Sequence, residues 1–172
     1  CAQGSPQALA CLSLLEPAQR QAGFAAYLNS VQELLLRDGR GAYEARRDAA
    51  EALGQAVAAV GQLETSERGT AFTELTGQLA RLAAERGEWV RRGAVKALGQ
   101  AVVAVGTLDA SERGTTFNKI TGELAALATD SEDEQVRNDA VVALGQAVGA
   151  VGQLETSERG TAFTELTNEL VA

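Results

Sequence analysis

Three serines, Ser66, Ser111 and Ser157, are each followed by glutamate and arginine, so polar groups stand beside a potential nucleophile. An enzyme normally needs one such site, however, and here the same Ser-Glu-Arg triplet recurs three times. The chain also contains no histidine, the commonest general base near neutral pH and the commonest metal ligand. We therefore interpret the serines as helix N-caps and predict that the protein is not an enzyme.

Two further groups of residues have side chains that can bind metal ions. Because there are only two cysteines, Cys1 and Cys11, one chain cannot build a zinc site from four thiolates. The acidic residues at 130–134 could hold calcium, but they lack the glycine-punctuated loop of an EF-hand. We interpret this cluster as a solvated helix start, with Ser131 and Glu134 at the spacing of a capping box. The sequence predicts no metal site and no cofactor.

The chain is a tandem repeat. Residues 52–79 return at 143–170 with 25 of 28 positions identical, and a looser copy begins at Ala97. A unit of 45 to 46 residues is too small to bury its own apolar face, so neighbouring units must stack into a solenoid. We divide this single domain into an N-terminal tether with a leading half repeat (1–16), three repeats (17–63, 64–108 and 109–154) and a trailing half repeat (155–172).

Each unit contains two stretches in which apolar residues recur at three- and four-residue steps, for example at 72–83 and at 90–105. This spacing predicts a pair of amphipathic helices, and no segment alternates with a period of two over a useful length. Three glycines, Gly54, Gly99 and Gly145, fall inside the second helices, where glycine costs about 1 kcal/mol relative to alanine. We expect tight packing between neighbouring hairpins to compensate.

The second helix of each unit carries a recurring motif. Residues 45–54, 90–99 and 136–145 read ARRDAAEALG, VRRGAVKALG and VRNDAVVALG. This motif resembles the Val-Arg-x-x-Ala-x-x-Ala-Leu-Gly helix of HEAT repeats, particularly the bacterial repeats of the phycobilisome-lyase type. The resemblance implies an all-α fold, a right-handed α-solenoid of HEAT-like helical hairpins. The chain departs from the compact bacterial subtype in its longer period and in lacking the usual proline of the first helix.

The resemblance implies a non-enzymatic protein-protein interaction scaffold, a subunit or assembly factor of a larger bacterial complex. Two alternatives stay open: a lyase- or chaperone-like factor that handles a bilin or cofactor-bearing protein, and an internal fragment of a longer cytosolic HEAT-repeat protein. The net charge of −8 and the pI near 4.6 argue against a nucleic-acid partner, because neutralising phosphates requires a basic surface.

In the solenoids that this chain resembles, the second helices line the concave face. Positions there that differ between the copies, together with a recurring glutamine, form a candidate partner-binding strip. The strip comprises Arg47, Glu51, Gln55, Arg92, Lys96, Gln100, Val103, Asn138, Val142 and Gln146. Neutral drift of surface positions is the alternative. We interpret a second recurring set, Arg46, Arg91 and Arg137, as a ladder of pairs between adjacent units.

Two other places are candidate interaction sites. Trp89 is the only tryptophan and stands at the start of a helix, where an exposed tryptophan suits an interface anchor. In the trailing half repeat, Phe163, Leu166 and Leu170 match residues that pack on a following helix. We expect part of this apolar end to be exposed and to be covered by another chain, another copy or further sequence.

The chain begins Cys-Ala-Gln-Gly-Ser and contains no methionine. A cysteine at position one, followed by small and polar residues, resembles the mature end of a bacterial lipoprotein, whose cysteine carries lipid. This resemblance implies lipid attachment at Cys1 and a periplasmic location in the bacterial cell envelope, with a cytoplasmic location as the alternative. A segment that happens to start at Cys1 is the competing interpretation.

Overall fold

The structure is a computed structural model that describes residues 9, 11–37, 39, 41–85 and 87–171. Its elements follow in chain order: η1 (Cys11–Leu14), α2 (Pro17–Leu35), α3 (Ala42–Ala59), η2 (Val60–Gln62), α4 (Thr65–Ala83), α5 (Glu88–Ala104), η3 (Val105–Thr107), α6 (Ala110–Asp130), α7 (Glu134–Ala150), η4 (Val151–Gln153) and α8 (Thr156–Val171). Throughout this described part of the chain the regular structure is helical, so the predicted all-α class is confirmed.

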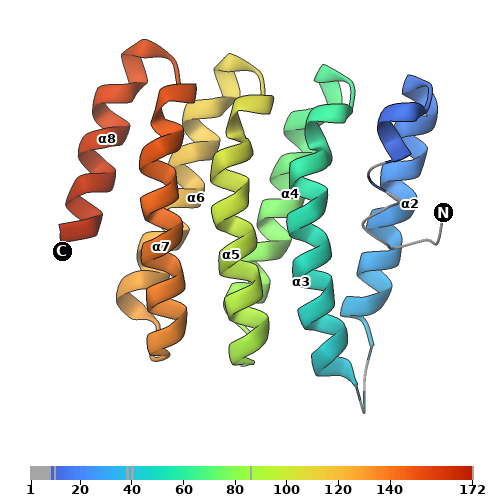
Figure 1. The fold of residues 1–172 in the computed structure, drawn as a ribbon, viewed down its shortest axis with the longest axis horizontal. Helices are drawn as coiled ribbons and strands as arrows, with labels where there is room; N and C mark the ends of the chain where they lie inside the picture. The colour runs from blue at the N-terminus through green and yellow to red at the C-terminus, as the bar shows by residue number, and fades with distance from the viewer. Residues whose placement is uncertain (1–8, 10, 38, 40, 86, 172) are drawn as a thin grey trace.

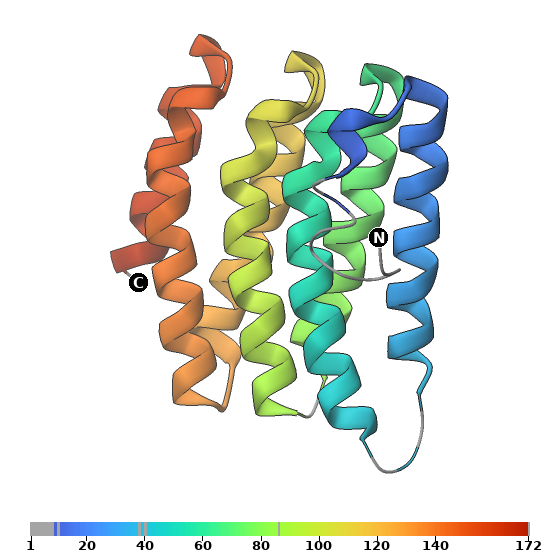
Figure 2. The same cartoon turned by 45° about the vertical axis from the view of Figure 1, so that its right-hand side comes forward.

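The helices form two rows. Figure 1 shows α3, α5 and α7 side by side in one row, with α4 and α6 behind them and α2 and α8 at the two ends. Neighbours in the α3–α5–α7 row pack extensively on each other, whereas α4, α6 and α8 contact each other much less. Figure 2, turned by 45°, shows the same succession of hairpins. The predicted solenoid of stacked helical hairpins is therefore present.

Small residues allow the close approach within the α3–α5–α7 row. A Cβ placed on Gly54 of α3 would lie 2.9 Å from the Cβ of Ala97 on α5. A Cβ placed on Gly99 of α5 would lie 3.0 Å from the Cβ of Ala143 on α7. Real Cβ atoms rarely approach so closely, so these two glycines have the packing role predicted for them. Gly145 has no such neighbour among the described atoms.

The turn between the two helices of a hairpin has the same construction in each copy. After α3, the 3₁₀ turn η2 leads to Leu63, which is buried and extended, and α4 begins at Thr65. The Nε of Arg68 donates a hydrogen bond of 2.9 Å to the Leu63 carbonyl. Three equivalent bonds join Arg20 to Leu15, Arg113 to Leu108 and Arg159 to Leu154. The arginine thus satisfies a carbonyl that the helices leave unpaired.

The predicted serine N-caps are wrong. The N-cap residues of α4 and α6 are Glu64 and Asp109, and neither side chain makes a capping hydrogen bond. Ser66 and Ser111 lie within the first turn of their helices, because each helix begins two residues earlier than a serine N-cap would require. The serines mark these helix starts correctly, but their hydroxyls do not occupy the cap position.

The connection from α2 to α3 uses glycine where the chain turns. Gly39 and Gly41 have φ angles of 82° and 94°, in the left-handed region that glycine adopts without steric cost. Gly41 is the N-cap residue of α3. In the described part of the chain, every helix is too short or too polar to cross a lipid bilayer.

Candidate functional site

The predicted partner-binding strip lies along α3, α5 and α7. Most of its side chains are exposed, and Gln55 and Arg92 are partly buried. The exposed members are Arg47, Glu51, Lys96, Gln100, Val103, Asn138, Val142 and Gln146. The structure therefore brings the predicted residues together on one row of helices, where they form a continuous polar surface interrupted by two exposed valines.

A groove of about 290 Å³ opens in this surface between α3 and α5. Its lining consists of Arg47, Glu51 and Gln55 from α3, and of Gly93, Lys96, Ala97 and Gln100 from α5. Five of these seven residues belong to the predicted strip. The other two, Gly93 and Ala97, have small side chains, which leave space for the groove. The lining offers cations, a carboxylate and two carboxamides, a set able to bind peptide carbonyls, amides and charged side chains.

At the equivalent junction an ion pair joins α5 to α7. Asp139 stands on α7 where Gly93 stands on α5, and its Oδ2 accepts a 2.8 Å bond from Nε of Arg92. The Nζ of Lys96 lies 4.0 Å from the same oxygen. At the α3–α5 junction no carboxylate replaces Gly93, and the guanidinium of Arg47 instead pairs with its neighbour Asp48 at 2.7 Å. Three of the seven lining positions differ between the two junctions, and only the difference between Gly93 and Asp139 adds an ion pair across the helices.

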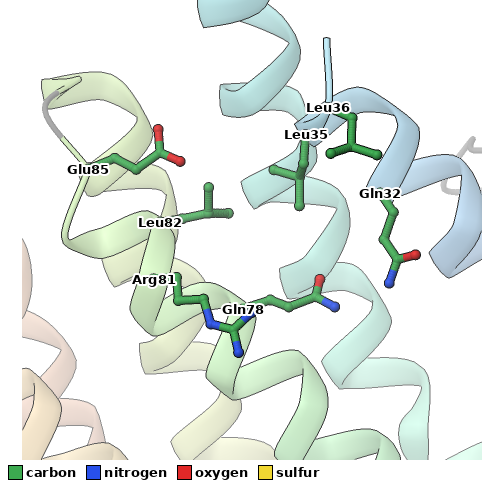
Figure 3. A pocket seen from close by; sticks show the side chains of 7 residues that line it. All are labelled: Gln32, Leu35, Leu36, Gln78, Arg81, Leu82 and Glu85. Carbon is green, nitrogen blue, oxygen red and sulfur yellow. The ribbon is translucent and has the colours of Figure 1, made fainter.

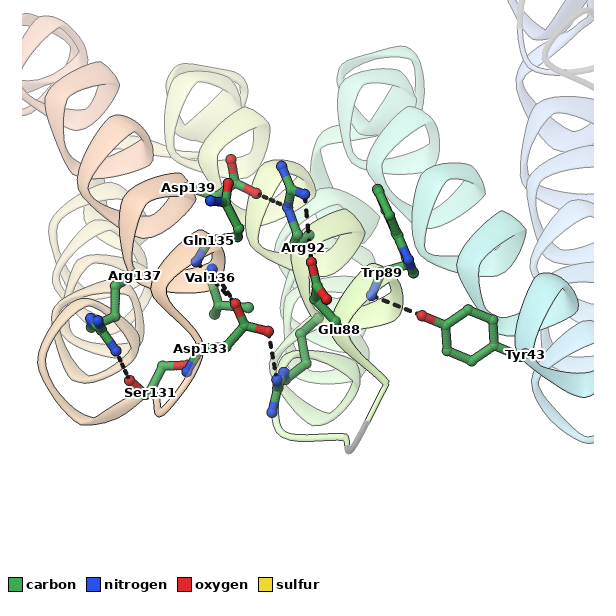
Figure 4. Close-up of polar contacts among 11 residues, drawn as sticks. Tyr43, Glu88, Trp89, Arg92, Ser131, Asp133, Gln135, Val136, Arg137 and Asp139 are labelled. Atoms are coloured by element: carbon green, nitrogen blue, oxygen red, sulfur yellow. Dashed lines mark hydrogen bonds and ion pairs between the residues drawn. The ribbon is translucent and has the colours of Figure 1, made fainter.

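Aromatic side chains stand at the foot of the α3–α5 groove. Trp89, at the start of α5, is 56% exposed, and Tyr43 at the start of α3 is 41% exposed. The hydroxyl oxygen of Tyr43 accepts a 3.0 Å hydrogen bond from the Trp89 backbone amide. The guanidinium of Arg92 lies 5.3 Å from the centre of the Trp89 ring, within cation–π range. Figure 4 shows Trp89 between Arg92 and Tyr43. We call these three residues the aromatic cluster.

Hydrogen bonding fixes the charged groups beside this cluster. The bond from Arg92 to Asp139 raises the pKa of the guanidinium further above its already high ordinary value. The bond from Arg47 to Asp48 raises the pKa of that guanidinium in the same way. Both arginines therefore carry a full positive charge at any pH at which the protein is folded.

Asp133 anchors the start of α7. Its carboxylate accepts hydrogen bonds from the backbone amides of Gln135 and Val136 (Figure 4). It also forms a 2.9 Å ion pair with Arg91. Partial burial acts to raise the pKa of this carboxyl, but the amides and the guanidinium outweigh it, and the net pKa is lowered. The predicted capping box of Ser131 and Glu134 is wrong, because Asp133 occupies the cap and its Oδ1 accepts from both amides, while its Oδ2 faces Arg91.

The arginine ladder is present in part. Arg91 pairs across units with Asp133, and Arg46 lies 3.6 Å from Glu85 in the following unit. Arg137, in contrast, donates a 2.7 Å bond to the carbonyl of Ser131, just before its own helix. In the two internal units, the arginines therefore link neighbouring hairpins.

The apolar end formed by α8 is only partly as predicted. Phe163 is 50% exposed, as expected. Leu166 is buried, so its prediction as a partner-binding residue is wrong: its side of α8 turns back onto α6 and α7. The side chain of Leu170 lies outside the described residues, as does Cys1.

A larger cavity, of about 400 Å³, lies between the C-terminal ends of α2 and α4, and sequence reasoning missed it. Figure 3 shows Gln32, Leu35 and Leu36 on the α2 side of this cavity and Gln78, Arg81, Leu82 and Glu85 on the other. It arises where the first hairpin departs from the repeat, so the repeat pattern gave no signal for it. Three leucines and two glutamines make up most of its lining, and Glu85 at its edge pairs with Arg46 of α3.

No cluster of three or more side chains suited to holding a metal ion occurs within the described ranges. The absence of a metal stays a prediction, because nothing in the structure tests it.

No protein-family model and no curated protein matches the chain. Among solved structures, the chain is similar to a designed armadillo repeat protein in complex with the peptide (KR)4, at 16% identity and a TM-score of 0.46. That similarity covers 94% of this chain and 69% of the other. An engineered protein is similar at 16% identity and a TM-score of 0.47, covering 96% of this chain and 71% of its own.

Proposed function

We propose that this protein is a non-enzymatic protein-protein interaction scaffold that binds a polypeptide segment in the α3–α5 groove. The observation that carries the proposal is the aromatic cluster at the foot of that groove. Exposed tryptophan, tyrosine and arginine are the residue types that dominate binding energy at protein interfaces. Here the Tyr43 hydroxyl fixes the Trp89 backbone and the Arg92 guanidinium lies over its ring, which limits the side-chain entropy lost on binding.

The packing of the two rows supports this assignment. Because α3, α5 and α7 pack more closely than α4, α6 and α8, we infer that the array bends toward the α3–α5–α7 row. The groove and the aromatic cluster would then lie on the concave side, where a bound segment contacts several helices at once. The α5–α7 junction offers less room, since Asp139 bridges it to Arg92.

The test uses the single tryptophan as a reporter. Peptides selected from a phage-displayed random library against the whole chain should change Trp89 fluorescence on binding. Trp89→Ala should weaken their affinity by about thirtyfold, the loss expected for an interface anchor of about 2 kcal/mol. Gly93→Asp should also weaken binding, because the new carboxylate would pair with Arg47 as Asp139 pairs with Arg92.

Val141→Ala is the matched control, since Val141 is an exposed apolar residue of α7 that does not belong to the partner-binding strip. It should leave the affinity of the selected peptides unchanged. If the peptides bind Trp89→Ala and Gly93→Asp as tightly as the parent, the α3–α5 groove is not the binding site and the proposal fails.

We further propose that the scaffold belongs to a larger complex at the bacterial cell envelope, with lipid attached at Cys1. The support is the lipoprotein-like start of the sequence. The intact mass of protein purified from its native source tests it: a diacylglycerol and an acyl chain on Cys1 should be present, and Cys1→Ser should remove both. An unmodified Cys1 would contradict the anchor and leave the groove proposal intact.

A further inference from the structure

The outer face of the last hairpin, formed by α7 and α8, has the residues of an internal junction. Val141 is 46% exposed, whereas Ala50 and Val95 at the equivalent positions of α3 and α5 are fully buried. Phe163 is half exposed, whereas its equivalent Phe72 is fully buried. Apolar side chains that other copies bury thus lie open on this face, at some distance from the α3–α5 groove.

The internal junctions show what covers such residues. The first point of contact is a helix: Ala97 and Gln100 of α5 lie against Gly54 of α3, and a Cβ on that glycine would lie 2.9 Å from each of them. The same arrangement joins α7 to Gly99 of α5. The position on the outer face is Gly145, where a Cβ would meet no described atom within 4 Å.

The second point of contact is the turn that follows. The side chain of Thr107 lies 3.1 Å from a Cβ placed on Gly61, and the Gly106 amide donates a 2.8 Å bond to Oε1 of Gln153. In addition, Nη1 of Arg68 donates a 3.3 Å bond to the Thr107 carbonyl of the next hairpin. On the outer face the equivalent glycine is Gly152, where an added Cβ would again meet no described atom within 4 Å.

The third point of contact is the start of the next helix. The carboxylate of Glu112 lies directly on Gly69 of α4, and that of Glu158 lies on Gly114 of α6. A side chain at either glycine would collide with the carboxylate. The equivalent residue on the outer face is Gly160, where an added Cβ would meet no described atom within 4 Å.

We propose that the α7–α8 face is the docking site for one further helical hairpin of this same repeat type. The occupant's first helix would place an alanine and a glutamine against Gly145. Its turn would lie on Gly152, and a glutamate at the start of its second helix would lie on Gly160. Val141 and Phe163 would be buried beneath it. Each of these three contacts already occurs at the internal junctions of the molecule, at the glycines equivalent to Gly145, Gly152 and Gly160.

The test extends the chain by one hairpin. Because Ala172 is equivalent to Arg81, a copy of residues 82–133 fused after Ala172 continues the repeat in register. If the face docks a hairpin, amide hydrogen exchange around Gly145 in α7 should become at least about tenfold slower than in the parent chain. The extended protein should also unfold in one transition at a higher urea midpoint.

Gly145→Leu separates docking from mere attachment. In the parent chain it should leave stability unchanged or increased, because its position is open. In the extended chain it should abolish both the slowed exchange and the raised midpoint, and Gly160→Leu should act in the same way.

Two results would overturn the proposal. In one, the added hairpin melts separately and exchange in α7 does not change. In the other, the parent chain is already a dimer whose α7 amides are protected in proportion to its concentration, so that a second copy covers the face. Trp89→Ala affects neither readout, so failure here is distinguishable from failure of the groove proposal.

Discussion

Residues 52–79 and 143–170 have almost the same sequence but different surroundings. One face of the first stretch, in α3 and α4, is covered by the α5–α6 hairpin, whereas in the described structure nothing covers the equivalent face of the second, in α7 and α8. Leu75 and its equivalent Leu166 are both buried, since they face inward within their own hairpin. Phe72 and Phe163 differ in exposure, since Phe72 is fully buried and Phe163 is half exposed. The comparison therefore separates what a repeat buries by itself from what its neighbour buries for it.

The largest expected difference between the two stretches concerns their phenylalanines. Phe72→Ala should lower the free energy of unfolding by about 3–5 kcal/mol, because it removes a fully buried ring and leaves a cavity. Phe163→Ala should cost only about 1 kcal/mol, since half of that ring is already in water. Urea denaturation of both variants measures the difference. Equal losses would mean that the outer face is covered in solution.

The second difference concerns two equivalent glycines, Gly54 and Gly145, whose replacement by alanine should change the stability in opposite directions. Gly54→Ala should destabilise the protein, because its Cβ meets that of Ala97 and overpacking of about 1–3 kcal/mol outweighs the gain in helix propensity. Gly145→Ala should stabilise it by up to about 1 kcal/mol, since only the propensity term applies. Thermal unfolding of the two variants checks the signs. A destabilising Gly145→Ala would contradict the assignment of an open face.

The sequence was sufficient to predict the hairpins, because apolar residues at helical spacing recur twice in every unit. It also placed Trp89 and the polar strip on one row of helices. It did not predict the α3–α5 groove, where Gly93 stands in place of the aspartate that pairs with the arginine of the neighbouring helix at the α5–α7 junction. That pairing joins residues 46 or 47 positions apart, and only the stacking of the hairpins brings them together.

Two of the three wrong predictions have related causes. Leu166 was assigned to the open face because its helix is the last, but one helix has an inner and an outer side and Leu166 lies on the inner one. Ser131 was assigned to a cap from its spacing to Glu134, although Asp133 is closer to the amides that need acceptors. Helical periodicity identifies which residues share a side; the neighbour on that side is set by tertiary packing.

The smallest expected difference is electrostatic and concerns two arginines of the arginine ladder, Arg91 and Arg137. Arg91 pairs with Asp133 of the following hairpin, whereas Arg137 turns back to the carbonyl of Ser131. The net pKa of Asp133 in the folded protein lies below its ordinary value of 3.8. Its ionised form therefore stabilises the fold, fully above that ordinary value, and the contribution is lost as the pH falls through the folded-state pKa.

Asp133→Asn should consequently reduce the acid sensitivity of the protein. Between about pH 5 and about pH 2.5 the urea midpoint of the parent should fall more steeply than that of the variant, which keeps a capping side chain but no titrating group. Arg91→Gln should also flatten the acid limb, by a smaller amount, because the backbone amides of Gln135 and Val136 would still hold the carboxylate. Parallel curves for Asp133→Asn and the parent would show that this link between α5 and α7 contributes nothing that depends on charge. The stacking of the hairpins would then rest on the remaining contacts between them, among which are the apolar and glycine contacts that the α7–α8 face still offers.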